Sequence, residues 1–244
     1  MDFTLKKYQE LLEVLKHHNY HRIRHDIDLR PEYALRVAEM EFKMGTSATY
    51  YFRSMHFSTH KETIQAIVAL GHQAGYHYES LTACKGDIEA AYDDFKKNLE
   101  ELRKIVPVNT ACAHGSPRSP WNSQDIWNRH DIHTLGIEYE PMLDTDFSAT
   151  LYLTDTGRRW DGYRVSVRDK VSHYHGQWIN EGLSFHSTDD IIHAINNKEH
   201  PIHKKELLFN THPQRWMPFG VGWMKEASLQ RGKNIIKRII VSNQ

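Results

Sequence analysis

Short apolar segments alternate with longer helical patterns along most of this 244-residue chain. The short segments are rich in β-branched or aromatic residues, as strands are, whereas apolar residues of an amphipathic helix recur every three or four positions. On this basis we expect strands at 21–28, 47–53, 74–79, 109–115, 137–142, 150–155, 183–187 and 207–212. We expect helices at 31–44, 61–69, 87–105, 189–196 and about 222–237.

This order of strands and helices predicts an α/β fold with mainly parallel strands joined by crossover helices. Seven to eight strands are compatible with an open doubly wound sheet and with a (β/α) barrel. No G-x-G-x-x-G follows the first strand, which disfavours a dinucleotide-binding sheet. No Ser/Gly-rich linker interrupts the chain, so we expect a single domain over residues 1–244.

The first twenty residues, MDFTLKKYQELLEVLKHHNY, predict an amphipathic helix at about 3–19, because apolar residues recur there at helical spacing between charges. A secretory signal would need an unbroken apolar core, and a membrane-spanning helix about 20 apolar residues. The sequence shows neither pattern. We therefore expect a cytoplasmic protein without a transmembrane segment.

Thirty-one acidic and thirty-one basic residues cancel, which argues against a nucleic-acid-binding protein. The two cysteines, Cys84 and Cys112, form no C-x-x-C pair, so neither a disulfide framework nor a zinc ribbon is indicated. Eighteen histidines are an unusually large number for a chain of this length. Their positions therefore matter more than the overall charge.

Ionisable residues stand at the end of nearly every expected strand. These residues are Asp26, Asp28, Arg53, His77, Glu79, His114, Asp155, His186 and His212. In a barrel, the carboxyl ends of the strands form one face, which is where catalytic groups gather. Carboxylates and imidazoles brought together in this way are typical of a divalent-metal site with mixed oxygen and nitrogen ligands.

Asp26 and Asp28 lie two residues apart on the first expected strand, and so on the same face of it. In a poorly solvated place their charges repel each other unless a cation lies between them. A bound metal ion would remove this conflict. The alternative is that one aspartate caps the following helix and the other faces water.

Several motifs, taken together, resemble the polysaccharide deacetylase superfamily (NodB homology, carbohydrate esterase family 4). HDID resembles its first motif, GHQAGYHYES its second and LLFNTHPQRW its last. CAHGSP and LTDTGRRW are similar to a divergent branch associated with O-antigen or other surface-polysaccharide synthesis. The resemblance covers about residues 21–216, and the family fold that it implies is a distorted (β/α) barrel.

This resemblance implies a role for four residues. Asp26 corresponds to the general base, and Asp28 and His77 to ligands of a divalent metal, for which we expect zinc. His212 corresponds to the general acid.

The sequence departs from the family motif at the third metal ligand. The second histidine of the family's H-x-x-x-H would fall at position 81, where this chain has Leu81. We expect His114 to replace it, with Glu79 as the alternative. A site with only two ligands, which binds metal weakly or not at all, also remains open.

Two further residues are candidates for binding substrate. Arg53 closes an expected strand and would meet an anionic group of the substrate, or else pair with Asp26. Trp216 follows the last motif and would offer its ring to a sugar, or else serve packing.

We therefore expect a hydrolase that acts on C–N bonds other than peptide bonds and removes acetyl groups from an N-acetylated or O-acetylated sugar. Two alternatives stay open. One is a catalytically impaired carbohydrate-binding protein on the same barrel, and the other a metal-dependent sugar isomerase. The sequence does not indicate the sugar or the oligomeric state.

Overall fold

A computed structural model describes all residues except 19, 116–118, 163–164, 167 and 243–244. The fold is α/β, and the described residues form one six-stranded sheet with the order β4-β3-β2-β1-β6-β5. Its strands are β1 (His21–Ile27), β2 (Thr49–Phe52), β3 (Gln73–Tyr78), β4 (Ala111–Ala113), β5 (Thr150–Thr154) and β6 (Glu206–Thr211). The pairs β2–β3, β3–β4 and β5–β6 are parallel, as the alternation of strands and helices predicts.

Two of the eight expected strands are wrong. In segment 137–142, Tyr139 forms only an isolated bridge with Thr110, and the Glu140 carboxylate accepts the backbone N–H of Met142 in a turn. In segment 183–187, the Asp190 carboxylate accepts the backbone N–H groups of His186 and Ser187, and Ser187 caps the next helix instead of ending a strand. In both places a side chain binds the backbone groups that a strand would have used.

The helices are α1 (Leu5–Leu15), α2 (Pro31–Lys43), α3 (Lys61–Ala69), α4 (Ser80–Ala83), α5 (Ile88–Arg103), α6 (His175–Asn180), α7 (Thr188–Asn196) and α8 (Val221–Ser242). Short 3-10 helices cover Ser54–His56, Ser123–Asn128, Ile132–Leu135, Pro201–Lys204 and Pro213–Arg215. The longer helices begin where their capping residues predict. The Asp87 side chain accepts the Ala90 N–H to start α5, and Ser187 and Asp190 form a capping box at α7. The patterns did not predict α4 or α6, which are too short to show a helical period.

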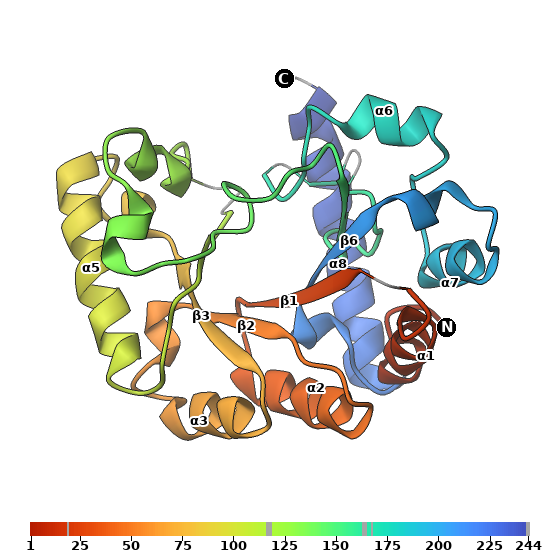
Figure 1. Ribbon diagram of the computed structural model, residues 1–244, viewed down its shortest axis with the longest axis horizontal. Helices are drawn as coiled ribbons and strands as arrows, with labels where there is room; N and C mark the ends of the chain where they lie inside the picture. The colour runs from red at the N-terminus through yellow and green to blue at the C-terminus, as the bar shows by residue number, and fades with distance from the viewer. Residues whose placement is uncertain (19, 116–118, 163–164, 167, 243–244) are drawn as a thin grey trace. The chain divides into compact units, whose positions relative to one another are not determined.

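The chain forms two compact units. Unit 2 comprises His25–Glu39 and Ser47–Thr145. Here α3 and α5 pack against β3 (Figure 1), and the aromatic rings of Tyr76, Tyr78 and Phe95 contact one another in the core. The register pairs His77 with Cys112, which brings the ends of β3 and β4 together.

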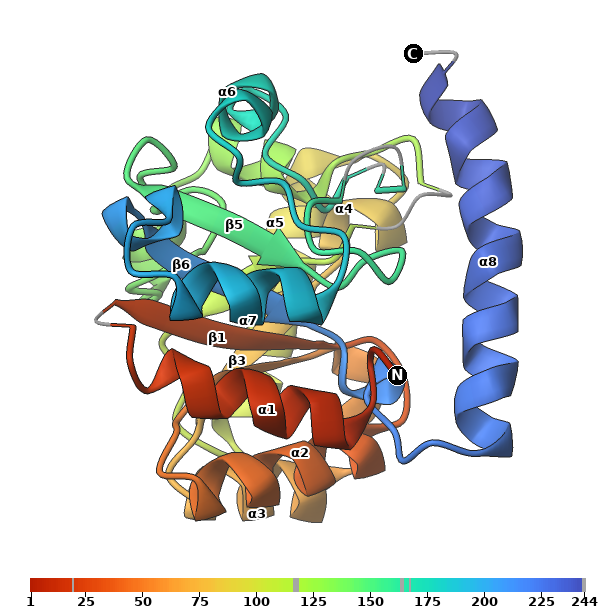
Figure 2. The same cartoon turned by 90° about the vertical axis from the view of Figure 1, so that its right-hand side faces the viewer.

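Unit 1 comprises Met1–Arg24, Met40–Thr46 and Asp146–Gln244. The predicted N-terminal helix is α1, which packs on α7 (Figure 2). The Asp2 carboxylate accepts the N–H and the hydroxyl of Thr188, so the first residues of the chain are fastened to the start of α7. Among the residues described, no helix is long and apolar enough to cross a bilayer.

Gly75 marks a close contact within the sheet of unit 2. A Cβ atom at this position would lie 2.5 Å from the ring of Tyr51. That ring is buried, and its hydroxyl is held 2.8 Å from the Thr110 hydroxyl, so it has little freedom to move. A side chain at position 75 is therefore excluded.

We predict that Gly75→Ala lowers the free energy of unfolding by ~1–3 kcal/mol, because the added methyl group overpacks β3 against Tyr51. Denaturant unfolding checks this. The matched control is Gly176→Ala in α6, where a Cβ meets nothing within 4 Å, and which should be neutral or stabilising by up to ~1 kcal/mol. Equal effects of the two substitutions would contradict the prediction.

Candidate functional site

Strand β1 carries Asp26 and Asp28 to the edge of unit 2. Asp26 is 5 % exposed and Asp28 is partly exposed, one residue beyond the end of β1. The side chain of His25, on the opposite face of the strand, stacks near the Tyr50 ring. Strand alternation therefore turns both carboxylates to one side.

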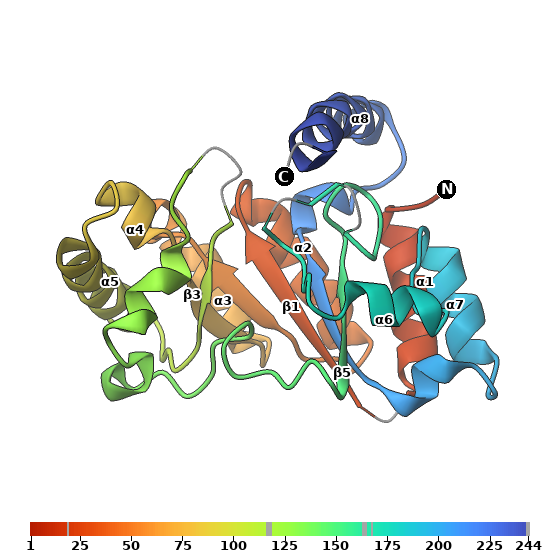
Figure 3. The ribbon, with the colours of Figure 1, turned by 90° about the horizontal axis from the view of Figure 1, so that it is seen from above.

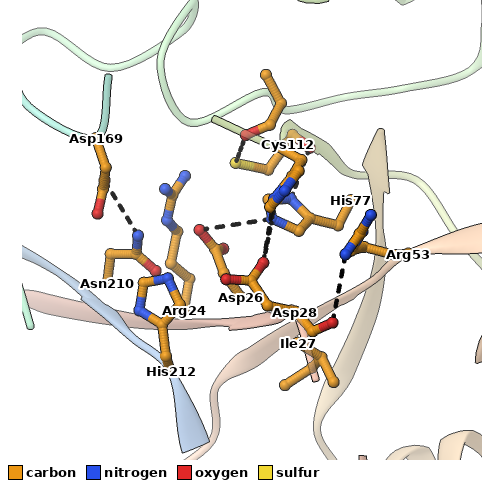
Figure 4. Close-up of polar contacts among 12 residues, drawn as sticks. Arg24, Asp26, Ile27, Asp28, Arg53, His77, Cys112, Asp169, Asn210 and His212 are labelled. Carbon is orange, nitrogen blue, oxygen red and sulfur yellow. Dashed lines mark hydrogen bonds and ion pairs between the residues drawn. The ribbon is translucent and has the colours of Figure 1, made fainter. Parts of the chain in front are cut away.

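The imidazole of His77 on β3 faces these carboxylates (Figure 4). Its Nε2 lies 3.4 Å from an Asp28 oxygen and 3.9 Å from an Asp26 oxygen. Its Nδ1 lies 3.0 Å from the Cys112 carbonyl oxygen, to which it can only donate. This hydrogen bond selects the tautomer and leaves Nε2 to act as a ligand.

Burial by itself would lower the pKa of His77, but the charges of Asp26 and Asp28 outweigh burial and raise that pKa. The same negative potential that favours a proton here favours a metal cation. A proton and a metal ion would compete for Nε2.

His114 follows β4 and completes a group of three possible ligands. Its backbone N–H donates to the Tyr78 carbonyl at 2.7 Å, which places it beside the end of β3. Its Nδ1 lies 3.1 Å from an Asp28 oxygen and 3.2 Å from His77 Nε2. One ligand atom from each of Asp28, His77 and His114 lies within 4.8 Å of the others. Asp26, His77 and Cys112 form a second such group, also buried in unit 2.

Two neighbouring residues are engaged elsewhere. Leu81 is buried in an apolar cluster with Ala91 and Ile126. The Glu79 carboxylate is ion-paired with Arg53, whose Nη2 lies 2.5 Å away. Arg53 also approaches the Asp28 carbonyl oxygen at 3.5 Å. The geometry therefore brings His114, rather than Glu79, to the group of ligands, and it gives Arg53 a protein partner.

Unit 1 holds a second buried cluster, built on Asp155 and His212. Asp155 lies directly after β5 and is fully buried, and His212 directly follows β6. The carboxylate lies 2.6 Å from His212 Nδ1 and accepts the backbone N–H of His212 at 2.8 Å. Arg215 forms an ion pair with the same carboxylate.

Burial by itself would raise the pKa of Asp155, but the charges of Arg215 and His212 outweigh burial and lower that pKa. Asp155 is therefore ionised at neutral pH. Its contact with Nδ1 orients the imidazole of His212. Asp155 is one of the ionisable residues that the sequence places at the strand ends, and the structure pairs it with His212.

Trp216 belongs to the same cluster. Its side chain is 1 % exposed, and its ring contacts Phe3, Tyr8 and Trp160. Its indole N–H donates to Asp155 at 2.8 Å. The structure therefore gives Trp216 a packing role and a hydrogen bond that holds the Asp155 carboxylate.

Asp169 is a polar centre of unit 1 that the sequence did not indicate, because it stands in an irregular segment. Its carboxylate accepts hydroxyl groups from Tyr152, Thr154 and Thr156 at 2.5–2.6 Å. Burial by itself would raise its pKa, but the positive charge of Arg24 and these hydrogen bonds lower the pKa to about 2.

No protein-family model and no curated protein matches the chain. Among solved structures, it is similar to a mutant of the peptidoglycan deacetylase PdaC from Bacillus subtilis, with 11% identity, a TM-score of 0.40, and coverage of 91% of this chain and 96% of that one. It is also similar to a CE4 esterase of Streptococcus mutans, with 12% identity, a TM-score of 0.47, and coverage of 97% and 88%.

A family 4 carbohydrate esterase from Bacillus anthracis is similar at 11% identity and a TM-score of 0.41, with coverage of 93% and 84%. Identities and TM-scores this low carry no argument about activity. The functional argument therefore rests on the residues of the site.

We predict that Leu81→His destabilises the protein by at least ~2 kcal/mol and adds no metal affinity, because it puts an imidazole into an apolar cluster. Denaturant unfolding and metal titration of the variant check this. The control, Leu81→Met, keeps the volume and should cost less than ~1.5 kcal/mol. Tighter metal binding by the histidine variant would show that position 81 faces the ligands.

We predict a pH-dependent loss of stability for Asp169→Asn. A pKa lowered from 3.8 to about 2 contributes stability that is present above pH 3.8 and is lost as the pH falls through 2. At ~1.4 kcal/mol per pKa unit, the variant should be roughly 2 kcal/mol less stable at pH 7. Unfolding curves from pH 7 to pH 2.5 should show this difference shrinking.

The control for this measurement is Asp93→Asn on α5, whose side chain is 75% exposed. It should change the stability by a few tenths of a kcal/mol, about what an exposed ion pair contributes. A deficit of Asp169→Asn that stays constant down to pH 2.5 would exclude linkage to the charge of the carboxylate.

Proposed function

We propose that this protein is a metal-dependent hydrolase that removes an acetyl group from an N-acetylated or O-acetylated sugar. The observation that carries the proposal is the convergence of Asp28, His77 and His114, whose ligand atoms lie within 4.8 Å of one another, with Asp26 beside them on the same strand face. In the proposal, Asp26 is the base, His212 the acid, and Asp28, His77 and His114 the metal ligands.

The donor set suits a divalent metal of the zinc type. One carboxylate and two imidazoles are ligands that leave an open coordination position for substrate. The Cys112 carbonyl already fixes the His77 ring, as an outer-shell partner does in catalytic zinc sites. Bound at these residues, the ion would lower the pKa of water toward ~7 and polarise the acetyl carbonyl group.

Asp26 then has a defined task. Its carboxylate takes the proton of the attacking water as the new C–O bond forms at the acetyl carbon. The site is largely buried, which strengthens every charge interaction within it. His77 and His114 hold their ring positions through contacts within unit 2 and need not move.

His212 supplies the second proton transfer in the proposal. As the C–N bond breaks, Nε2 gives its proton to the departing nitrogen, so the products are acetate and a free amine. The Asp155 carboxylate supports this role, because its contact with Nδ1 orients the ring. Arg53 and Trp216 are not needed as substrate contacts in this scheme, since each has a protein partner.

The finer part of the proposal comes from the sequence motifs. Their likeness to the branch associated with O-antigen synthesis suggests an intermediate of surface-polysaccharide assembly as the substrate. A cytoplasmic location would suit such an intermediate.

We predict that the purified protein binds about one zinc per chain and that His77→Ala loses it, because His77 belongs to both possible ligand groups. His114→Ala should weaken the binding at least ~10-fold, whereas Glu79→Gln should retain the metal. Elemental analysis and metal titration check this. His193→Ala, at an exposed position of α7, is the control. Loss of metal in Glu79→Gln but not in His114→Ala would reverse the choice of the third ligand.

We predict that Asp26→Asn keeps the metal but lowers acetate release from an N-acetylated oligosaccharide by at least ~100-fold, because the base is lost. His212→Ala should lower kcat ~10²–10⁴-fold, also without loss of metal. Acetate assays on metal-loaded protein check both. Tight sugar binding without acetate release by the unmodified protein would favour the carbohydrate-binding alternative instead.

A further inference from the structure

Helix α8 contacts the rest of unit 1 through polar groups. Glu226 is ion-paired with Arg158 at 2.5 Å, and the Asn234 amide donates to the Gly157 carbonyl at 2.8 Å. The Trp223 indole donates to the Phe3 carbonyl, and the buried Gln230 donates to Asn234. These four positions are spaced by three or four residues, so they form one face of the helix.

The outer face of α8 carries four large apolar residues among small and basic ones. Val221, Met224, Leu229 and Ile235 are exposed by 62, 48, 61 and 63 %. A surface helix usually buries its large apolar residues against the core. In α8 these four residues face outward instead. Figures 2 and 3 show the helix running apart from α1, α6 and α7 of the same unit.

The charges around this outer face have one sign. Lys225, Arg231 and Lys233 are exposed. Glu226 is the acidic residue of this helix, and it is held by Arg158 on the inner face. A helix face that combines large apolar residues with basic ones is typical of helices that lie in the surface of an anionic bilayer.

A second copy of the chain fits this face less well. Two such helices laid together would bring lysine and arginine side chains against each other with no outward acidic partner. An anionic lipid surface uses both features, since the acyl chains take the apolar residues and the headgroups take the positive charges.

We propose that the outer face of α8, formed by Val221, Met224, Leu229 and Ile235 with Lys225, Arg231 and Lys233, binds the surface of an anionic membrane. The polar inner face keeps the helix attached to unit 1, so the whole protein would be held at the bilayer without crossing it. This proposal does not depend on the proposed enzymatic function.

Co-sedimentation of the full chain with vesicles tests it. We expect binding to vesicles of phosphatidylcholine that contain about 30% phosphatidylglycerol. Binding to vesicles of pure phosphatidylcholine should be at least ~10-fold weaker. Raising the salt from about 0.1 M to about 1 M should weaken the binding to the anionic vesicles, since it shortens the Debye length from ~10 Å to ~3 Å.

Two double variants separate the apolar contribution to vesicle binding from the electrostatic one. Met224→Ser with Ile235→Ser removes apolar contacts, and Arg231→Gln with Lys233→Gln removes positive charge. Each should weaken binding at least ~10-fold. The control is Ile179→Ser on α6, also an exposed apolar residue, which should bind as the unmodified chain does. Circular dichroism confirms that each variant is folded.

Three results would overturn the proposal. The first is equal binding to both kinds of vesicle, and the second is binding that neither double variant weakens. The third is a stable dimer in light scattering that Met224→Ser with Ile235→Ser abolishes, because this would make a second copy the occupant of the face.

Discussion

The arrangement of unit 2 centres on the imidazole of His77, which faces two carboxylates on one side of β1. Asp26 and Asp28 repel each other in a largely buried place, and His77 lies within 3.9 Å of both. The Cys112 carbonyl holds the other ring nitrogen, so the imidazole cannot turn away. The pairing of β3 with β4 also places His114 beside His77 and Asp28. The negative potential and the fixed nitrogen together make the place suited to a cation.

In unit 1 the charge of a buried carboxylate is balanced by protein groups. Asp155 is fully buried and ionised, and its charge is balanced by Arg215 and by hydrogen bonds from His212 and Trp216. A buried carboxylate is tolerated when its oxygens are paired in this way. Removing one partner would leave the carboxylate incompletely paired, and its desolvation would then be costly. These contacts also give the His212 ring a fixed orientation.

Much of the fold follows from local pattern. Each of the six strands overlaps a β-branched or aromatic segment that the sequence indicated, although β3 and β6 begin one residue earlier than expected, and α3 has the bounds that its pattern predicted. The two wrong strand predictions also have local causes. Segments 137–142 and 183–187 carry strand-like residues, but Glu140 and Ser187 bind nearby backbone N–H groups and form a turn and a helix cap instead. The pattern of residue types along the chain indicates which side chains favour burial. It does not indicate which side chains compete for backbone hydrogen bonds.

The sequence by itself determined the order of strands and helices and placed ionisable residues at the strand ends, because both depend on spacing along the chain. Only the tertiary structure shows that Glu79 is ion-paired with Arg53 and that His114 lies beside the end of β3. The tertiary structure also places Trp216 in the core, and it leaves four apolar residues of α8 at the surface. These outcomes depend on which distant groups share a space, and spacing along the chain does not contain that information.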